Sequence, residues 1–311
     1  KPVGGFFLYT CIGWYRKKFL VNKSDSNNKV QLQFDGVFRN ASFWLNGFYV
    51  GTNQSGYVGI NYDVTNYVNF NKENCLVVRV DATQYEGWFY EGAGIYRHVW
   101  LNTFQPLHIT DDVFIRSTTK TNQSTITIDV PIQNETYNNN NCDVETYITT
   151  REGKKLKTVT NKNILIQTGN TKIVQQQLII PDANLWSVEN PYLYRTVTLI
   201  KQQGKIIDSV QHRIGIRTIE IKPNGVFLNG KHIKILGVNC HQDHAGIGSA
   251  LPDYLQYYRV ELLKQMGANA YRTSHHAPTP ELLDACDSLG MLVMDEQRLL
   301  NSSTEYLNQF E

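Results

Sequence analysis

The sequence predicts a multidomain, mainly β protein whose chain ends in an α/β segment. Short alternating runs of apolar and polar residues fill its first part, and a second series of such runs follows Pro106. Beyond Pro223, strand-like runs alternate with helical ones. A chain of 311 residues has room for two or three domains at about 150 residues each. We therefore expect domains over residues 1–105, 106–220 and 221–311.

The first segment, which runs to about Phe104, has the pattern of an antiparallel β domain. Its Asn46-Gly47 pair stands between two apolar alternating runs, at residues 41–45 and 48–50. An Asn-Gly pair in that setting is a strong hairpin signal, because both turn positions need a positive φ. Further strands are expected at residues 30–34 and 76–80.

The second segment has the pattern of an immunoglobulin-like β-sandwich. Strands are expected at residues 112–116, 124–130, 144–150, 173–180 and 193–201. Polar segments separate them, including the run of four asparagines at residues 138–141, which cannot pack in a core. The Cys and Trp hallmarks of antibody domains are absent, and the pattern does not give the order of the strands in the sheets.

The third segment reads as strand, helix, strand, helix, strand. A second Asn-Gly hairpin, at residues 229–230, leads into a strand at residues 233–238. Helices are expected at residues 254–266 and 280–289, and strands at residues 268–272 and 291–295. Gly267 and Gly290 stand where the two helices should end. Alternation of this kind predicts parallel strands.

The composition excludes several classes of protein. Thirty basic residues against 28 acidic ones leave a net charge of +2, too balanced for a protein that binds nucleic acid. No apolar run approaches the ~18 residues of a transmembrane helix, so we expect no membrane span. The five cysteines are odd in number, widely scattered and without a Cys-x-x-Cys pair. They predict buried free thiols, and neither a disulfide framework nor a thiolate zinc site.

Polar side chains follow all three predicted parallel strands. The carboxyl ends of such strands meet at one edge of a sheet, where reactive residues gather. Packing would place apolar side chains at these positions, so the sequence predicts a functional site there. The residues at the three strand ends are Asn239, His241, Asp243 and His244, then Arg272, His275 and His276, then Asp295 and Glu296.

Two other functions remain open at this point. His241, Asp243, His244 and His275 could converge on a zinc ion, although no fixed spacing such as His-Glu-x-x-His is present. Alternatively, the β domains could form a non-catalytic carbohydrate-binding module. Its aromatic faces would be built on residues such as Trp14, Tyr57, Tyr62 and Tyr90.

Residues 269–294, which begin Asn-Ala-Tyr-Arg-Thr-Ser-His-His-Ala-Pro, resemble a signature of glycoside hydrolase family 2. This is the family of β-galactosidases, β-glucuronidases and β-mannosidases. The sequence departs from it at His276-Ala277, where the family usually has Tyr-Pro. Four further motifs are similar to the family's N-terminal sugar-binding domain, and they occur in the family's order. They begin at Gly13, Phe34, Trp44 and Gly92, the last reading Gly-Ala-Gly-Ile-Tyr-Arg97.

The resemblance covers nearly the whole chain and is weakest over residues 107–220. It implies a retaining glycosidase built from a jelly-roll β-sandwich, an immunoglobulin-like sandwich and a TIM (β/α)8 barrel. The barrel of the family holds two glutamates, the acid/base after the fourth strand and the nucleophile on the seventh. Residues 221–311 are too few for a barrel of about 250 residues. We therefore expect a fragment that lacks both glutamates and is inactive alone, so no catalytic residue is assigned.

The resemblance assigns roles around the missing glutamates. His241 and His275 match the family's two histidines that contact sugar hydroxyls, as neutral imidazoles. Arg272 matches the arginine that keeps the nucleophilic carboxylate ionised, a role suited to a fixed guanidinium. The alternative for Arg272 is a salt bridge to Asp295 or Glu296.

Four further positions are weaker candidates. Asn239 and Asp243 are expected to shape the substrate pocket, and Glu296 to support the nucleophile together with Arg272. Glu86, before Trp88, lies where β-galactosidases extend a carboxylate from the jelly roll into the sugar pocket, although the loop spacing differs.

The expected substrate is a terminal β-galactoside, because the Asn-x-His after the first parallel strand and the strand ending in Asp295-Glu296 lean towards β-galactosidases. The expected partner is this carbohydrate, with a homo-oligomer as an option for the whole enzyme. No nucleotide cofactor is expected, while a divalent or sodium ion near the sugar would follow some family members. A bacterial periplasmic or cytoplasmic setting follows from analogy only. The exposed edge of an incomplete barrel predicts self-association or local disorder near residues 296–311.

Overall fold

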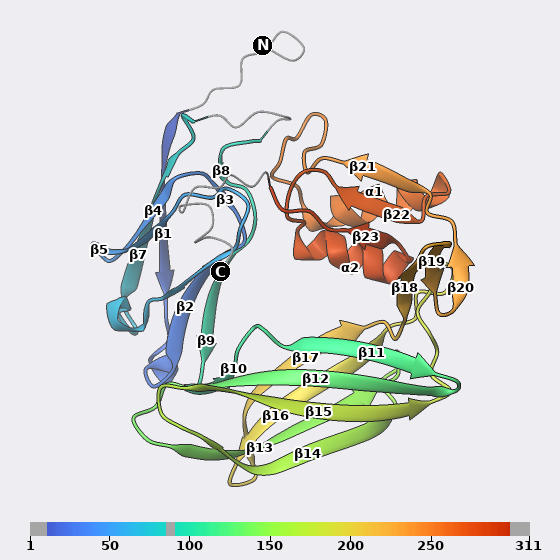
Figure 1. The fold of residues 1–311 in the computed structure, drawn as a ribbon. Helices are drawn as coiled ribbons and strands as arrows, with labels where there is room; N and C mark the ends of the chain where they lie inside the picture. Colours follow the sequence, from blue (N-terminus) through green and yellow to red (C-terminus); the bar gives the residue numbers. More distant parts are fainter. Residues whose placement is uncertain (1–10, 85–90, 299–311) are drawn as a thin grey trace.

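The computed structural model describes residues 11–84 and 91–298. It is mainly β, and Figure 1 shows three domains: a β domain at the upper left, a second β domain below it, and an α/β unit at the upper right. The sequence-based fold class is confirmed. The expected self-association or disorder at residues 296–311 falls largely on residues outside the described part of the chain.

The first domain is a jelly-roll sandwich of two sheets, ordered β1-β7-β4-β5 and β6-β2-β9, with a short β3-β8 pair. Alternate residues of β2, β4 and β7 are buried, so Phe34, Phe43 and Val78 fill the core between the sheets. Its strands are β1 (Ile12–Leu20), β2 (Lys29–Phe34), β3 (Val37–Phe38), β4 (Ala41–Leu45), β5 (Phe48–Asn53), β6 (Ile60–Asp63), β7 (Glu73–Asp81), β8 (Gly94–Ile95) and β9 (Val99–Phe104). The 3-10 helices η1 (Lys23–Asp25) and η2 (Thr65–Tyr67) connect them.

Both predicted Asn-Gly hairpins are confirmed. Asn46 and Gly47 join β4 to β5 with φ of 53° and 88°. Asn229 and Gly230 do the same in the third domain with φ of 52° and 75°. Two consecutive positive φ values match the right-handed twist of the flanking strands, which explains why this dipeptide predicts the turn.

The second domain is an immunoglobulin-like sandwich. One sheet is β10-β12-β11 with β15 on the other side of β12, and the facing sheet is β14-β13-β16-β17. Isoleucines of β12 such as Ile126 and Ile128 are fully buried between the sheets. Its strands are β10 (Leu107–Ile109), β11 (Phe114–Lys120), β12 (Gln123–Asn134), β13 (Asn140–Thr149), β14 (Lys155–Ile166), β15 (Thr171–Pro181), β16 (Tyr194–Gln202) and β17 (Lys205–Ile214).

The second domain corrects two sequence-based expectations. The strands β14 and β17 lie at the edges of their sheet and carry many exposed polar residues, so their alternation was too weak to indicate them. The asparagine run is also not entirely a loop, because Asn140 and Asn141 begin β13 and pair with β14. Their side chains are half-buried or exposed and do not enter the core.

The third domain begins with an antiparallel sheet, followed by the first βα units of a barrel with the parallel order β21-β22-β23. The strand expected over residues 233–238 is in fact two strands, because residues 234–236 leave the pairing between them. Neither helix is long and apolar enough to cross a membrane in the described part of the chain. The elements are β18 (Ile219–Lys222), β19 (Gly225–Leu228), β20 (Lys231–Ile233), β21 (Gly237–Cys240), α1 (Asp253–Gln265), β22 (Ala270–Thr273), α2 (Pro280–Leu289) and β23 (Leu292–Met294).

The five cysteines are all free. Cys142 and Cys286 are buried, as expected, but Cys11 is exposed and the other two are half-buried. The expectation of buried thiols was therefore right for only two of them. Burial raises the pKa of the Cys142 thiol to about 11, and that of Cys286 to about 12, so both stay protonated at neutral pH.

The segment of residues 186–188, between β15 and β16, joins the second domain to the barrel units. Trp186 is fully buried and its indole Nε1 donates to the carbonyl oxygen of Asp287 in α2 at 2.7 Å. Lys264 Nζ, near the end of α1, donates to the carbonyl oxygens of Val188 at 3.0 Å and of Gly290 at 2.9 Å. Both helix ends are thus fixed to the same short segment.

We expect Gly290→Ala to destabilise the chain more than the matched change Gly267→Ala. Both glycines end a helix with positive φ, 79° and 95°, so a side chain costs about 1–2 kcal/mol at either. At Gly290 the added Cβ would also lie 2.3 Å from the carbonyl oxygen of Val188, whereas at Gly267 nothing in the described part of the chain lies within 4 Å. Urea denaturation of both variants would test this. Equal losses would contradict the close packing described for Val188.

Candidate functional site

The parallel strands present one row of side chains to the open face of the sheet. Tyr271 is buried on the opposite face, in the core formed with the two helices. Because side chains alternate along a strand, Arg272 points to the open face. Its register partners are Asn239 on β21 and Met294 on β23.

Glu296 connects two of the predicted site residues. One of its carboxylate oxygens forms an ion pair with Arg272 Nη2, and the other lies 2.7 Å from His275 Nδ1. The backbone N–H of Glu296 donates to Thr273 Oγ1 at 3.0 Å, which fixes the start of the loop after β23. Arg272 Nη1 donates to Asn239 Oδ1 at 3.2 Å. Side chains from three consecutive strand ends therefore form one network.

This network determines the protonation of its members. Burial would raise the pKa of the Glu296 carboxyl, but the hydrogen bonds from His275 and Arg272 outweigh it and hold the pKa below its usual value. Glu296 is therefore ionised at neutral pH and accepts from His275 Nδ1. A neutral His275 then carries its proton on Nδ1, which leaves Nε2 as an acceptor.

His241 lies beside His275, with the two ring centroids 6.2 Å apart. Its Nδ1 is 2.6 Å from the carbonyl oxygen of Ser274, an acceptor, so Nδ1 carries the proton here too. Two imidazoles of the same tautomer thus stand at adjacent strand ends. They can serve as hydrogen-bond partners for hydroxyl groups without changing the charge of the site.

Three arginines that the sequence reasoning missed hold the loops of the site. Arg259 of α1 donates to the carbonyl oxygens of His241 at 3.0 Å and Asp243 at 2.8 Å. Arg97 of the first domain donates to the carbonyl oxygen of Ala277 at 2.6 Å, in the loop that follows His275. Contacts with backbone carbonyls leave no sequence signal, although Arg97 ends a motif that the resemblance had singled out.

The third arginine, Arg298, connects the loop after β23 to the first domain through an ion pair. It pairs with Glu91 at 2.9 Å, and the two side chains are only 3% and 5% exposed. The Arg298 guanidinium also lies 5.2 Å from the centre of the Tyr57 ring. The first domain therefore takes part in building the mouth of the site.

The other predicted site residues differ in where they lie. Asn239 is part of the network, whereas Asp243 is half-buried and its described contact is made by its backbone. His276 is buried, and burial first, then the charge of Arg97, lowers its pKa to about 3. Glu86 and Trp88 lie outside the described residues.

The zinc hypothesis is not supported by the geometry. Among residues 11–84 and 91–298, three side chains with ligand atoms close together, His98, Asp253 and Glu281, lie at another place. His241, Asp243, His244 and His275 do not form such a group. His241 and His244 instead contact backbone carbonyl oxygens through Nδ1, and His275 contacts Glu296. The described contact of Asp243 is made by its own carbonyl oxygen, which accepts from Arg259.

The aromatic faces expected for a carbohydrate-binding module are also corrected. Tyr57 is only 3% exposed, and Tyr62 is half-buried and packs on Phe43, so neither offers an open aromatic face. Trp14 is exposed and stacks on Trp44, while Tyr90 lies outside the described residues. The periodicity that suggested these faces could not distinguish a core ring from a surface ring.

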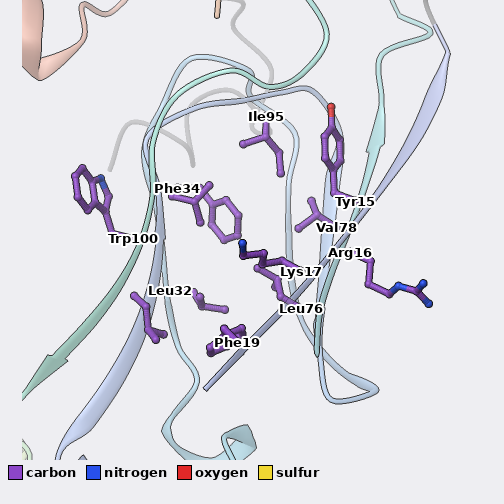
Figure 2. A pocket seen from close by; sticks show the side chains of 12 residues that line it. Tyr15, Arg16, Lys17, Phe19, Leu32, Phe34, Leu76, Val78, Ile95 and Trp100 are labelled. Carbon is purple, nitrogen blue, oxygen red and sulfur yellow. The ribbon is translucent and has the colours of Figure 1, made fainter. Parts of the chain in front are cut away.

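A cavity of about 450 Å³ lies between the two sheets of the first domain, beside β1 and β9. Figure 2 shows Phe19, Leu32 and Phe34 in its wall together with Leu76, Val78 and Ile95, and the Lys17 ammonium reaching in. Sugar hydroxyls need several polar partners. This lining is mostly apolar, so the cavity does not fit a sugar.

Three family models match successive parts of the chain. Residues 7–105 match "Glycosyl hydrolases family 2, sugar binding domain", residues 107–217 match "Glycosyl hydrolases family 2", and residues 219–309 match "Glycosyl hydrolases family 2, TIM barrel domain". Together they account for nearly the whole sequence.

Relatives with names of two kinds are similar to the chain. A β-galactosidase of Bacteroides ovatus is 35% identical over 297 residues, which are 94% of this chain and 35% of that protein. A putative β-glucuronidase of Formosa agariphila is 34% identical over 292 residues, 91% of this chain and 34% of that protein. The chain therefore spans about a third of the length of these relatives.

Solved structures of similar proteins have the same fold as this chain. A glycosyl hydrolase family 2 member from Bacteroides cellulosilyticus superposes with a TM-score of 0.89 at 33% identity, over 95% of this chain and 42% of that one. A β-glucuronidase of Bacteroides uniformis gives a TM-score of 0.89 at 29% identity, over 97% and 38%.

Proposed function

The chain belongs to glycosyl hydrolases family 2, and we propose that it is the sugar-binding, immunoglobulin-like and early barrel part of a retaining β-glycosidase acting on terminal β-galactosides. A retaining enzyme needs two carboxyl groups about 5–5.5 Å apart. In this proposal both are supplied by barrel residues outside the printed sequence. The 311 residues then form part of the substrate pocket and are inactive alone.

The observation that supports this proposal is the network of Arg272, Glu296 and His275 beside His241. Arg272 is held by Glu296 and Asn239, so its guanidinium has a defined position. A fixed cation near the nucleophilic carboxylate favours the ionised form that attacks the sugar. The cation and Glu296 also balance each other's charge, so the sugar meets a nearly neutral surface.

The two histidines act on the substrate in this proposal. With Nδ1 of each donating within the protein, Nε2 of each is the atom that can accept from a sugar hydroxyl. Hydrogen bonds to ring hydroxyls strengthen as the oxocarbenium-like transition state forms. His241 and His275 would therefore lower the barrier by binding the transition state more tightly than the ground state.

The neutral sugar is favoured over a uronic acid by the charges at the site. A β-glucuronide needs a cation for its carboxylate, and the site cation Arg272 is already paired with Glu296. The second candidate, β-glucuronidase activity, is supported by similar relatives that carry this name. A basic residue from the rest of the barrel would be required for it.

The test is turnover of nitrophenyl β-galactoside, β-glucuronide and β-mannoside by two proteins, the 311-residue chain and its gene extended through a complete barrel. We expect cleavage by the extended protein alone, with the galactoside fastest. A preference for the glucuronide would replace the substrate and keep the mechanism. Cleavage by the short chain would show that a catalytic pair lies among Asp243, Asp295, Glu296 and their neighbours, and would overturn the proposal.

A further inference from the structure

We propose that His98, Asp253 and Glu281 bind a divalent transition-metal cation at the junction of the first domain and the barrel units. His98 comes from the first domain, immediately before β9. Asp253 is the first residue of α1, and Glu281 lies in the first turn of α2. One cation would thus connect two domains through three elements that are distant in the sequence.

The ligand atoms are already close together. His98 Nε2 lies 2.7 Å from Asp253 Oδ1 and 3.7 Å from Glu281 Oε1, and one ligand atom from each residue lies within 4.8 Å of the others. Tetrahedral ligands bound at about 2.0–2.2 Å are separated by about 3.3 Å. Small side-chain rotations would produce that spacing, since His98 and Asp253 are 43% and 56% exposed and free to adjust.

A buried amide at the same place supplies an independent observation. Gln256 follows Asp253 by three residues, so both lie on one face of α1. It is only 6% exposed and lines the same cavity, yet its Oε1 has no hydrogen-bond partner among residues 11–84 and 91–298. A buried acceptor without a donor is costly. A metal-bound water, or the cation itself, would provide what this oxygen lacks.

The space and the charge also suit a cation. A cavity of about 330 Å³ is lined by His98, Asp253, Gln256 and Glu281 together with residues 249–252. Arg97 also lines this cavity, but its guanidinium donates to the carbonyl oxygen of Ala277 and to Gln242 Oε1. The first turns of α1 and α2 favour ionised carboxylates. A neutral imidazole and two carboxylates would therefore give the bound cation a local charge near zero.

The ligand types indicate which cation. Calcium takes six to eight oxygen ligands, whereas an imidazole with carboxylates suits zinc and its neighbours. Zinc is accordingly the probe, and calcium is the comparison. This inference does not depend on which sugar the whole enzyme cleaves, nor on its being an enzyme.

The experiment is calorimetric titration of zinc into the metal-free 311-residue chain at pH 7.5, with thermal melts in parallel. We expect one zinc ion to bind per chain and to raise the melting temperature. The variants His98→Ala and Asp253→Asn should each lower the affinity for this zinc ion by at least about tenfold, since even indirect partners of a metal contribute about 10–100-fold. The matched control is His232→Ala, an exposed histidine in the hairpin of β19 and β20, which should bind as the parent chain does.

Three results would overturn the proposal. One is the absence of zinc binding up to millimolar concentration. Another is equal binding by the parent chain and His98→Ala, which would place the zinc at other histidines. The third is calcium binding that survives His98→Ala, which would mean that the carboxylates act without the imidazole. Because the replaced side chains of His98 and Asp253 are 43% and 56% exposed, the variants should keep the fold, and their melts without metal would verify this.

Discussion

Replacing Glu296 by glutamine is expected to lower kcat of the barrel-extended enzyme on its preferred nitrophenyl glycoside by about 100-fold, the loss typical of a misplacement of about 1 Å at a reacting centre. The change keeps the size of the side chain and removes its charge. Arg272 then loses its ion-pair partner, and His275 loses the acceptor that fixes its tautomer. Glu296 acts here as a positioning residue, since it touches these two side chains.

The control for this prediction is Glu220→Gln. Glu220 pairs with Lys222 on the exposed edge strand β18, far along the chain from the strand ends, and its replacement should leave kcat unchanged. The split between kcat and KM is the second measurement. Because Glu296 positions Arg272 and His275, its loss should lower kcat more than it raises KM, an effect that mere loss of stability would not produce. A Glu296→Gln variant with kcat within threefold of the parent would show that the network has no role in the reaction.

The residues of this network could be predicted from the sequence because of the geometry of parallel strands. Asn239, Arg272 and Glu296 lie at the ends of three successive strands or directly after them, and parallel strands end at the same edge of a sheet. The choice of partner for Arg272, between Asp295 and Glu296, could not be predicted. It depends on where β23 ends and on the turn of the chain after Met294.

The missed parts of the site share a physical cause. Arg97 and Arg259 act on backbone carbonyls, and every residue has one, so their sequence context carries no trace of the contact. Arg298 pairs with Glu91 across more than two hundred positions of the chain, which no local pattern encodes. Strands were missed for a related reason, since edge strands such as β14 expose polar residues on both faces.

Replacing Trp186 by alanine is expected to give the largest loss of stability, about 3–5 kcal/mol, as for other fully buried tryptophans. The indole packs with Val188, Leu193 and Leu228, and the Arg217 guanidinium lies 4.6 Å from its centre. Its Nε1–H bond to Asp287 would be lost as well. Urea denaturation should therefore show an earlier transition for the barrel units, because the segment of residues 186–188 would no longer hold the ends of both helices.

The control variant Trp14→Ala separates the loss of the Trp186 contacts from the general effect of removing an indole. Trp14 is 63% exposed on the first domain, so Trp14→Ala should cost at most about 1 kcal/mol, the contribution of its stacking on Trp44. Equal losses in the two variants would mean that Trp186 does not join the domains. An earlier barrel transition in Trp186→Ala with the first domain unaffected would instead show that the sandwich supports the helices behind the site. The positions of His241 and Arg272 would then depend on a residue that contacts neither of them.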